Sequence, residues 1–320
     1  MPRLRHYSEF LFLALLLAAL AGLFGVLSDH FWSVATLQTI TNRIPALALA
    51  ALGMTFVLIA GGIDLSVGSV SAVAGAVFGW CVADHNLSVG VAFGAALTAA
   101  LGCGLLNGTL VNVLLMPSFI VTLGVLEAAR GAAYLVTGSQ TKYLGEKLGW
   151  LQDSVAGLGL SGAFLLAAGL TIGAQFVLTR TVLGRQMVAV GTNAEAARLV
   201  GISPSRIRAI VFALAGGLAG LAGLCHVARL GAADPNAGSG IELSAIAAAV
   251  IGGTSLMGGR GSMLATFIGV LIIATLEAGL AHLGVSEPMK RVATGIVIVG
   301  AVGAEAVRAR LAARRMRLAA

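Results

Sequence analysis

The feature that most constrains this chain is a series of long apolar segments with few charged residues between them. A helix needs about 20 mostly apolar residues to cross the hydrocarbon core of a bilayer. Because backbone polar groups in lipid must be hydrogen-bonded internally, the sequence predicts an all-α bundle of about ten spans. The candidate segments are 10–27, 44–60, 70–83, 88–107, 118–137, 161–179, 207–227, 242–257, 263–282 and 291–306.

The composition supports a membrane protein. Charged residues make up 10% of the 320 residues, whereas an ordinary soluble domain carries roughly 25%. The 44 glycines suit close helix packing in lipid. We therefore expect one transmembrane domain over residues 1–320, in contact with membrane lipid. Segment 70–83 is short, and a short segment beside a glycine-rich break is typical of a discontinuous helix.

The distribution of positive charge predicts the orientation. With the N-terminus in the cytoplasm, ten spans place thirteen Lys and Arg residues inside and six outside, as the positive-inside rule requires. Both termini are then cytoplasmic, including a basic tail over 307–320. Basic residues before segment 10–27 also fit a cleaved signal peptide, but the many later spans favour a retained helix. No basic patch interleaved with aromatic residues accompanies the net charge of +7, so we expect no nucleic-acid partner.

Residues 59–69 interrupt two apolar segments with Gly61, Gly62, Asp64 and Ser66. An aspartate so close to hydrocarbon is costly, and the two glycines permit non-helical backbone. One interpretation is a capping turn between spans, since Asp64 and Ser66 form an N-cap pattern. The other is a broken helix beside a substrate path. Residues 250–262 contain a similar glycine-rich turn, which indicates either an internal repeat or convergence.

Residues 180–208 form a charged loop on the cytoplasmic side of this topology. Thr192 and Glu195 have capping-box spacing, Gly201 suits the end of a helix, and Pro204 prevents its continuation. The sequence thus predicts a helix of about two turns. Such a short helix must pack on something. It is either an amphipathic connector on the membrane surface or a docking helix for a partner.

Several motifs resemble one family, the ribose, xylose and simple-sugar class of bacterial ABC-transporter permeases. Residues 61–69, Gly-Gly-Ile-Asp-Leu-Ser-Val-Gly-Ser, resemble its hallmark. The resemblance continues in order and covers most of the chain. Its other motifs are Leu-Leu-Asn-Gly at 105–108, Met-Pro-Ser-Phe-Ile-Val-Thr-Leu-Gly at 116–124, Ala-Arg-Gly at 129–131 and Val-Thr-Gly at 136–138.

The resemblance implies a multi-pass permease of the bacterial inner membrane that imports a ribose-like sugar as a homodimer. Glu195-Ala196-Ala197 with Gly201 resembles the coupling-helix element that docks on the ATP-binding subunit, and Arg198 lies in the same helix. ATP and magnesium would bind that subunit, because this chain has no Walker A sequence and needs no cofactor of its own. A periplasmic sugar-binding protein would dock on outer segments 138–160 and 228–241, whose default interpretation is a solvated surface.

Three further polar residues lie in apolar segments. Glu127 and Arg130 share a helix face and form either a structural ion pair or part of a substrate path. Asn107 either bonds between helices or lines the path. The path candidates are Gly61, Gly62, Asp64, Ser66, Asn107, Glu127 and Arg130.

Other functions were weighed against this one. No nucleophile motif and no metal-ligand spacing occurs, so we expect neither an enzyme nor a metal site. A permease for nucleosides or other small polar solutes is the alternative within the class. A secondary transporter or channel that works alone would need a chain of protonatable residues in the membrane, where Asp64, Glu127 and Glu277 stand out.

Overall fold

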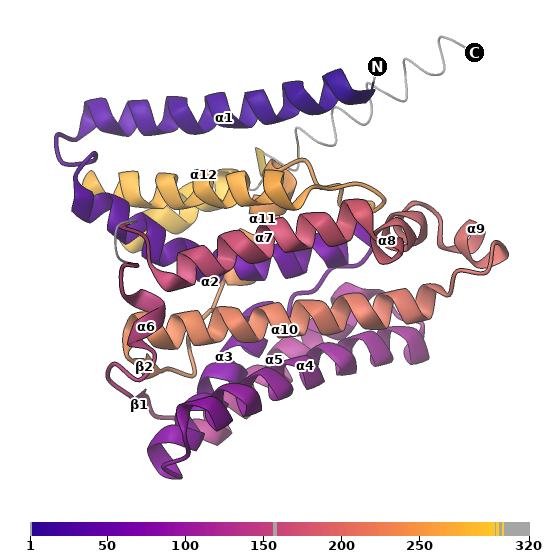
Figure 1. Ribbon diagram of the computed structural model, residues 1–320, viewed down its shortest axis with the longest axis horizontal. Helices are drawn as coiled ribbons and strands as arrows, with labels where there is room; N and C mark the ends of the chain where they lie inside the picture. The colour runs from indigo at the N-terminus through magenta and orange to yellow at the C-terminus, as the bar shows by residue number, and fades with distance from the viewer. Residues whose placement is uncertain (1, 156–158, 298, 301–302, 304–320) are drawn as a thin grey trace.

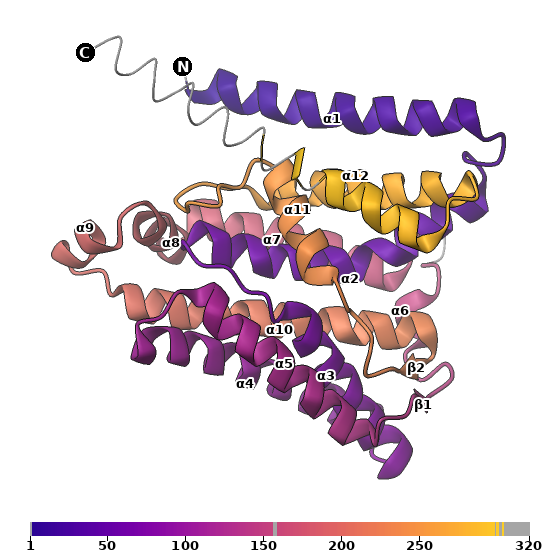
Figure 2. The same cartoon turned by 180° about the vertical axis from the view of Figure 1, so that it is seen from behind.

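The computed structural model describes residues 2–155, 159–297, 299–300 and 303 (Figure 1). Most of these residues are helical, and the long helices run roughly side by side along the longest axis (Figures 1 and 2). The basic tail at 307–320 and part of predicted span 291–306 lie outside the described residues. Within that span, residues 291–297 are helical. The all-α bundle predicted from the apolar segments is thereby confirmed for the part of the chain described.

Eight helices among the described residues are long and apolar enough to cross a membrane. The count of ten stays a prediction, because two of the ten segments are not in this set. Seven of the eight are α1 (Pro2–Leu27), α2 (Val34–Ile59), α4 (Val89–Leu114), α5 (Ser118–Thr137), α7 (Gly162–Arg180), α10 (Pro204–Leu230) and α12 (Met263–His282). The eighth combines α3 (Val67–Gly79) with the π-helical turn η1 (Trp80–Asp84).

The two ends of the bundle carry different short elements (Figure 1). One end, here called the α9 end, carries α8 (Val182–Thr192) and α9 (Ala194–Leu199). The other end, here called the β end, carries α6 (Gly149–Gln152) and the strands β1 (Lys142–Tyr143) and β2 (Ala232–Ala233). These strands pair antiparallel, with Lys142 opposite Ala233. Helix α1 starts at the α9 end and packs on α12.

Predicted span 242–257 is too long, because α11 (Ile241–Ile251) has only 11 residues. A helix of that length covers about 16 Å, roughly half of the hydrocarbon core. It stops because Gly253 has a φ of 80°, which favours glycine and is incompatible with a continuing right-handed helix. Helix α11 is therefore a half-length helix.

Two other predicted boundaries were wrong for a shared reason. Helix α2 begins at Val34 rather than near residue 44, and Ser33 caps it by accepting a hydrogen bond from the Thr36 amide. Helix α4 continues to Leu114 rather than ending near residue 107. In both cases the helix continues through polar residues, and hydropathy alone ends a segment where such residues begin.

Helix α10 lies at the centre of the packing, in contact with α2, α3 and α4. Small residues let these helices approach closely. A methyl group at Gly216 would lie 2.5 Å from the Ala100 carbonyl oxygen, so α10 and α4 meet almost backbone to backbone. Helix α3 packs on the same central helix, α10.

Candidate functional site

Residues 60–66 form a non-helical segment inside the bundle, here called segment A. It leaves α2 at the α9 end and runs back toward the start of α3, as the connector between these helices shows in Figure 2. Gly61 has a φ of 80°, which turns the chain out of α2. The helix is thus broken at residues 60–66, and their role beside a substrate path stays a prediction.

Asp64 anchors segment A and is only 1% exposed. Its Oδ1 accepts hydrogen bonds from the Ser66 amide at 2.9 Å and from the Ser66 hydroxyl at 2.6 Å. Asn107 of α4 donates from Nδ2 to Ser66 Oγ at 2.8 Å. The structure therefore brings Asp64, Ser66 and Asn107 together in one buried network. The turn of the first interpretation is present, because Asp64 accepts the Ser66 amide just before α3, but Ser66 as the N-cap residue makes no side-chain capping bond to the helix.

Helix α5 holds segment A from the other side. The Ile63 amide donates to Ser118 Oγ at 2.9 Å, and the Leu65 amide donates to Thr122 Oγ1 at 3.0 Å. Ser118 and Thr122 are four residues apart, so they lie on one face of α5. Two backbone amides that no helix satisfies thus gain side-chain acceptors, which a buried irregular segment requires.

A second non-helical segment, 234–240 or segment B, connects β2 to α11. Arg130 of α5 donates from Nη1 to the carbonyl oxygens of Pro235 at 2.6 Å and Ala237 at 3.0 Å. The Tyr134 hydroxyl bonds Asn236 Oδ1. Arg130 and Tyr134 continue the four-residue spacing of Ser118 and Thr122 along α5. One helix therefore holds both irregular segments.

The sequence indicates Arg130 as a site residue but does not indicate Tyr134, Asp234 and Asn236. Residues 228–241 carry the composition of a solvated loop, and nothing local in them indicates a buried contact. The signal that identifies them is the pattern Asp-x-(Ser/Asn)-x-Gly-Ser, which occurs at 64–69 and again at 234–239. Glu127 does not join this cluster in the manner of Arg130, because its side chain is exposed on the middle of α5.

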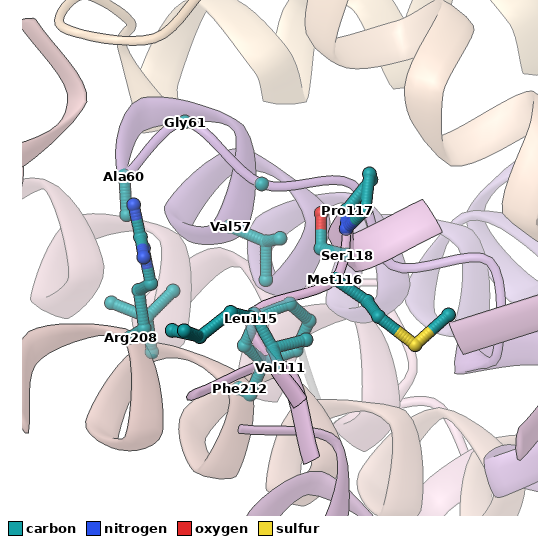
Figure 3. Close-up of a pocket in the computed structure, with 12 residues that line it drawn as sticks. Val57, Ala60, Gly61, Val111, Leu115, Met116, Pro117, Ser118, Arg208 and Phe212 are labelled. Atoms are coloured by element: carbon teal, nitrogen blue, oxygen red, sulfur yellow. The ribbon is translucent and has the colours of Figure 1, made fainter. Parts of the chain in front are cut away.

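A cavity of about 300 Å³ opens beside segment A at the α9 end (Figure 3). Gly61 and Gly62 line it together with Ser118 and Arg208. Phe212 and Leu115 supply part of its apolar wall. The cavity is thus bordered by the same segment that Asp64 anchors. Among the described residues, no group of three His, Cys, Asp or Glu side chains could hold a metal ion.

Helix α9 has the ends that the sequence indicates, with one correction. Its N-cap is Asn193, whose Oδ1 accepts from the Ala196 amide at 2.9 Å, and not Thr192, whose hydroxyl donates to Val188 within α8. Thr192 completes α8, so the capping position moves by one residue. Gly201 has a φ of 83°, and the Ile202 amide bonds the Ala197 carbonyl, which is a Schellman ending.

Helix α9 presents a mixed surface at the end of the bundle. Ala197 is buried at 4% exposure and seats the helix on the bundle, whereas Ala196 is exposed. Glu195 and Arg198 form an exposed ion pair at 2.8 Å. Beside them, the apolar side chains of Leu199 and Val200 are 80% and 75% exposed. Sequence analysis missed these two, although exposed apolar residues on a short helix are typical of a docking surface.

Gly191 of α8 lies against both glycine-rich turns, 59–69 and 250–262. A methyl group at Gly191, in the last turn of α8, would overlap the Ile59 carbonyl oxygen and lie 2.7 Å from the Gly259 amide. The Gly259 amide in turn donates to the Ile59 carbonyl at 2.9 Å. The turns after α2 and α11 therefore pack on the same residue of α8. Whether 59–69 and 250–262 are a repeat or convergent stays a prediction.

The chain is similar to permease components of known transport systems. Residues 36–302 match the family model described as a permease component of branched-chain amino acid transport systems. The chain is 39% identical over 292 residues to the ribose import permease protein RbsC of Escherichia coli K12, covering 89% of this chain and 90% of the relative. The ribose import permease of Bacillus subtilis 168 is 38% identical, over 87% of both chains. The galactofuranose transporter permease protein YtfT of Escherichia coli K12 is 38% identical, over 89% of this chain and 86% of the relative.

Proposed function

Because the chain belongs to the family of branched-chain amino acid transport system permease components, we propose that it is the membrane subunit of an ATP-driven sugar importer. The observation that carries the proposal is the match to ribose import permeases over nearly nine-tenths of both chains. The substrate is a ribose-like monosaccharide delivered by a periplasmic binding protein. The galactofuranose relative favours a sugar over the alternative, a nucleoside or other small polar solute.

In this proposal α9 is the coupling helix that docks on the ATP-binding subunit. The exposed Leu199 and Val200 would enter an apolar groove of that subunit, and the Glu195–Arg198 pair would face polar groups at its rim. ATP and magnesium bind the partner subunit. The α9 end is then cytoplasmic, and the β end faces the periplasm in a bacterial inner membrane.

The proposed subunit works as a homodimer. Glu127 supports this, because its side chain is exposed near the middle of α5, where lipid would otherwise surround it. A charged side chain at the bilayer centre costs about 2.5–3.5 kcal/mol on insertion scales. A second copy that faces this side of α5 would replace lipid with a polar passage for the sugar.

The passage would follow α5 and the two irregular segments. Segment A supplies Gly61, Gly62, Asp64 and Ser66, while Asn107 supports it from α4. ATP binding and release by the partner would change the relative stability of two arrangements of the bundle, which is sufficient to drive alternating access. The sugar itself needs only weak contacts, since the binding protein delivers it.

The direct test is uptake in proteoliposomes. The chain is reconstituted with its ATP-binding subunit and binding protein, and radiolabelled pentoses, hexoses and nucleosides are tested with and without ATP. Sugar uptake that requires ATP and both partners supports the proposal, and the accepted solute names the substrate class. Solute movement by the chain alone, unaffected by ATP, would identify a channel or secondary transporter and overturn it.

The docking role of α9 makes a separate prediction. In Glu195→Arg the exposed pair with Arg198 becomes two like charges, so stimulation of the ATPase should be abolished while the permease still inserts. ATP hydrolysis is measured with and without loaded binding protein. Glu287→Arg, which reverses another exposed i,i+3 ion pair, with Lys290, is the matched control and should leave coupling intact. Normal coupling in Glu195→Arg would count against docking through α9.

A further inference from the structure

The two irregular segments contain related sequences. Residues 61–69 read Gly-Gly-Ile-Asp-Leu-Ser-Val-Gly-Ser, and residues 231–239 read Gly-Ala-Ala-Asp-Pro-Asn-Ala-Gly-Ser. Both begin with Gly, have Asp at the fourth position and end with Gly-Ser. At the sixth position Ser66 corresponds to Asn236, and both are small polar residues.

The two copies share the turn at their aspartate, although Gly68 already lies in α3 whereas Gly238 lies in a turn before α11, with a φ of 73°. The Ser66 amide donates to Asp64 Oδ1 at 2.9 Å, and the Asn236 amide donates to Asp234 Oδ1 at 2.9 Å. Each copy follows a long helix, α2 or α10, and leads into another helix, α3 or α11. The first residues, Gly61 and Gly231, both have positive φ, at 80° and 61°. Sequence and backbone thus indicate the same unit twice.

The two copies meet at their matching glycines. A methyl group at Gly68 would lie 2.5 Å from the Gly238 carbonyl oxygen, and a methyl group at Gly238 would lie 2.9 Å from the Gly68 carbonyl oxygen. Such reciprocal contact is expected if a local two-fold axis passes between the glycines. Segment A enters from the α9 end and segment B from the β end (Figure 2). Opposite entry is the geometry of an inverted repeat.

We propose that residues 231–239 form the outer gate of the sugar passage, as the inverted counterpart of residues 61–69, and that Arg130 and Tyr134 are the latch that holds it. This inference rests on the proposed import function. Helix α5 holds the inner copy through Ser118 and Thr122 and the outer copy through Arg130 and Tyr134. A movement of α5 therefore acts on both gates at once.

The inner copy, 61–69, and the outer copy, 231–239, differ in how far their polar side chains are exposed, and the latch bonds limit further opening of the outer copy. Asp64 and Ser66 of the inner copy are 1% and 0% exposed, whereas the equivalent Asp234 is half-buried and Asn236 is exposed. Two copies of one element in unequal states are what alternating access through an inverted repeat requires, since the states exchange as the passage reopens on the other side. The latch residues stabilise the outer gate through three side-chain bonds, to Pro235, Asn236 and Ala237.

Cysteine labelling tests the latch in the assembled transporter. Cys81, Cys103 and Cys225 are replaced by alanine, and Ala237→Cys reports on the outer gate through its reaction with a membrane-impermeant maleimide added outside. Tyr134→Phe and Arg130→Gln each remove latch bonds, so the labelling rate should rise about three- to tenfold and lose its dependence on ATP. Tyr143→Phe, an exposed tyrosine of β1, is the matched control and should leave the rate unchanged.

A second reporter separates a latch from general loosening. Leu65→Cys lies on the inner copy, and its labelling from the cytoplasmic side should not rise in Tyr134→Phe. An unchanged rate at position 237 in both latch variants would overturn the proposal, as would an equal rise at positions 65 and 237. The labelling rates at positions 65 and 237 are measured without any transport assay. Failure of the wild-type protein to take up sugar with ATP would therefore refute the proposed import function and not the latch.

Discussion

At the scale of single residues, Asp64 shows how a carboxylate is accommodated in an apolar bundle. It is almost fully buried, and its Oδ1 receives both the amide and the hydroxyl of Ser66. Asn107 then donates to the same hydroxyl oxygen. Polar groups of segment A and of α4 thus bond one another, so segment A keeps a fixed shape without helical hydrogen bonds.

Removal of this carboxylate should destabilise the protein measurably. Asp64→Ala leaves the Ser66 amide and hydroxyl without their acceptor, and a buried unsatisfied group costs about 1–3 kcal/mol. The Tm in detergent should therefore fall by about 4–10 °C, with a smaller fall for Asp64→Asn. Asp84→Asn removes a partly exposed ion pair with Lys142 and serves as the control, with an expected cost of about 1 kcal/mol or less. Equal Tm values for Asp64→Ala and wild type would show that the network contributes nothing.

The sequence identified Asp64, Ser66 and Asn107 because a charge and two glycines within apolar segments are conspicuous. It did not identify Tyr134 and Asn236, because polar residues near the end of a span are indistinguishable from a solvated loop. Their contact depends on segment B entering the bundle, which is a tertiary event. The proximity of Glu127 and Arg130 in sequence was likewise uninformative, because the Arg130 guanidinium donates to carbonyls about a hundred residues away.

At the scale of elements, the junction of α8 with the two glycine-rich turns connects α9, through α8, to segment A. Gly191 packs against Ile59 and Gly259, and residue 59 is the last residue of α2 before segment A begins. A displacement of α8 is therefore transmitted to both turns by direct backbone contact. Glycine is required here because any side chain would push the turns apart.

Gly191→Ala should uncouple transport from ATP hydrolysis. The added methyl group separates α8 from the turns, so the ATP-binding subunit should still bind and hydrolyse ATP while sugar uptake falls by at least tenfold. Both activities are measured on the same reconstituted complex. Gly173→Ala in α7, where nothing lies within 4 Å of the added methyl group, is the control and should behave as wild type. Normal uptake by Gly191→Ala would exclude this junction as the route of coupling.

Element boundaries were predictable where caps and hydropathy agree. Helices α5 and α12 occupy the predicted spans 118–137 and 263–282. Helix α11 was overestimated because an apolar run with glycines continues beyond it, and the backbone angle of Gly253 is invisible to hydropathy. The extension of α2 back to Val34 was missed because its first turns carry Gln38, Thr41 and Arg43.

At the scale of the whole molecule, the proposed orientation makes the α9 end cytoplasmic and the β end periplasmic. In a variant without native cysteines, Glu146→Cys should react with an impermeant maleimide in intact spheroplasts. Glu195→Cys should react only after the membrane is opened. Both side chains are exposed, so a difference in rate reports on sidedness and not on burial. The reverse pattern would invert the orientation and exclude α9 from contact with a cytoplasmic ATPase.

The connections on either side of α9 are short, and their length determines how much of a movement of α9 reaches α8 and α10. Asn193 alone separates it from α8, and residues 200–203 separate it from α10. So few residues leave almost no slack, and the Schellman ending and the Ser203 cap fix most of them. A stroke applied to α9 must therefore displace the adjoining ends of both α8 and α10 by nearly the same distance. The lengths of these two connections, Asn193 and residues 200–203, therefore matter as much for the transmission of movement as the residues that contact the partner.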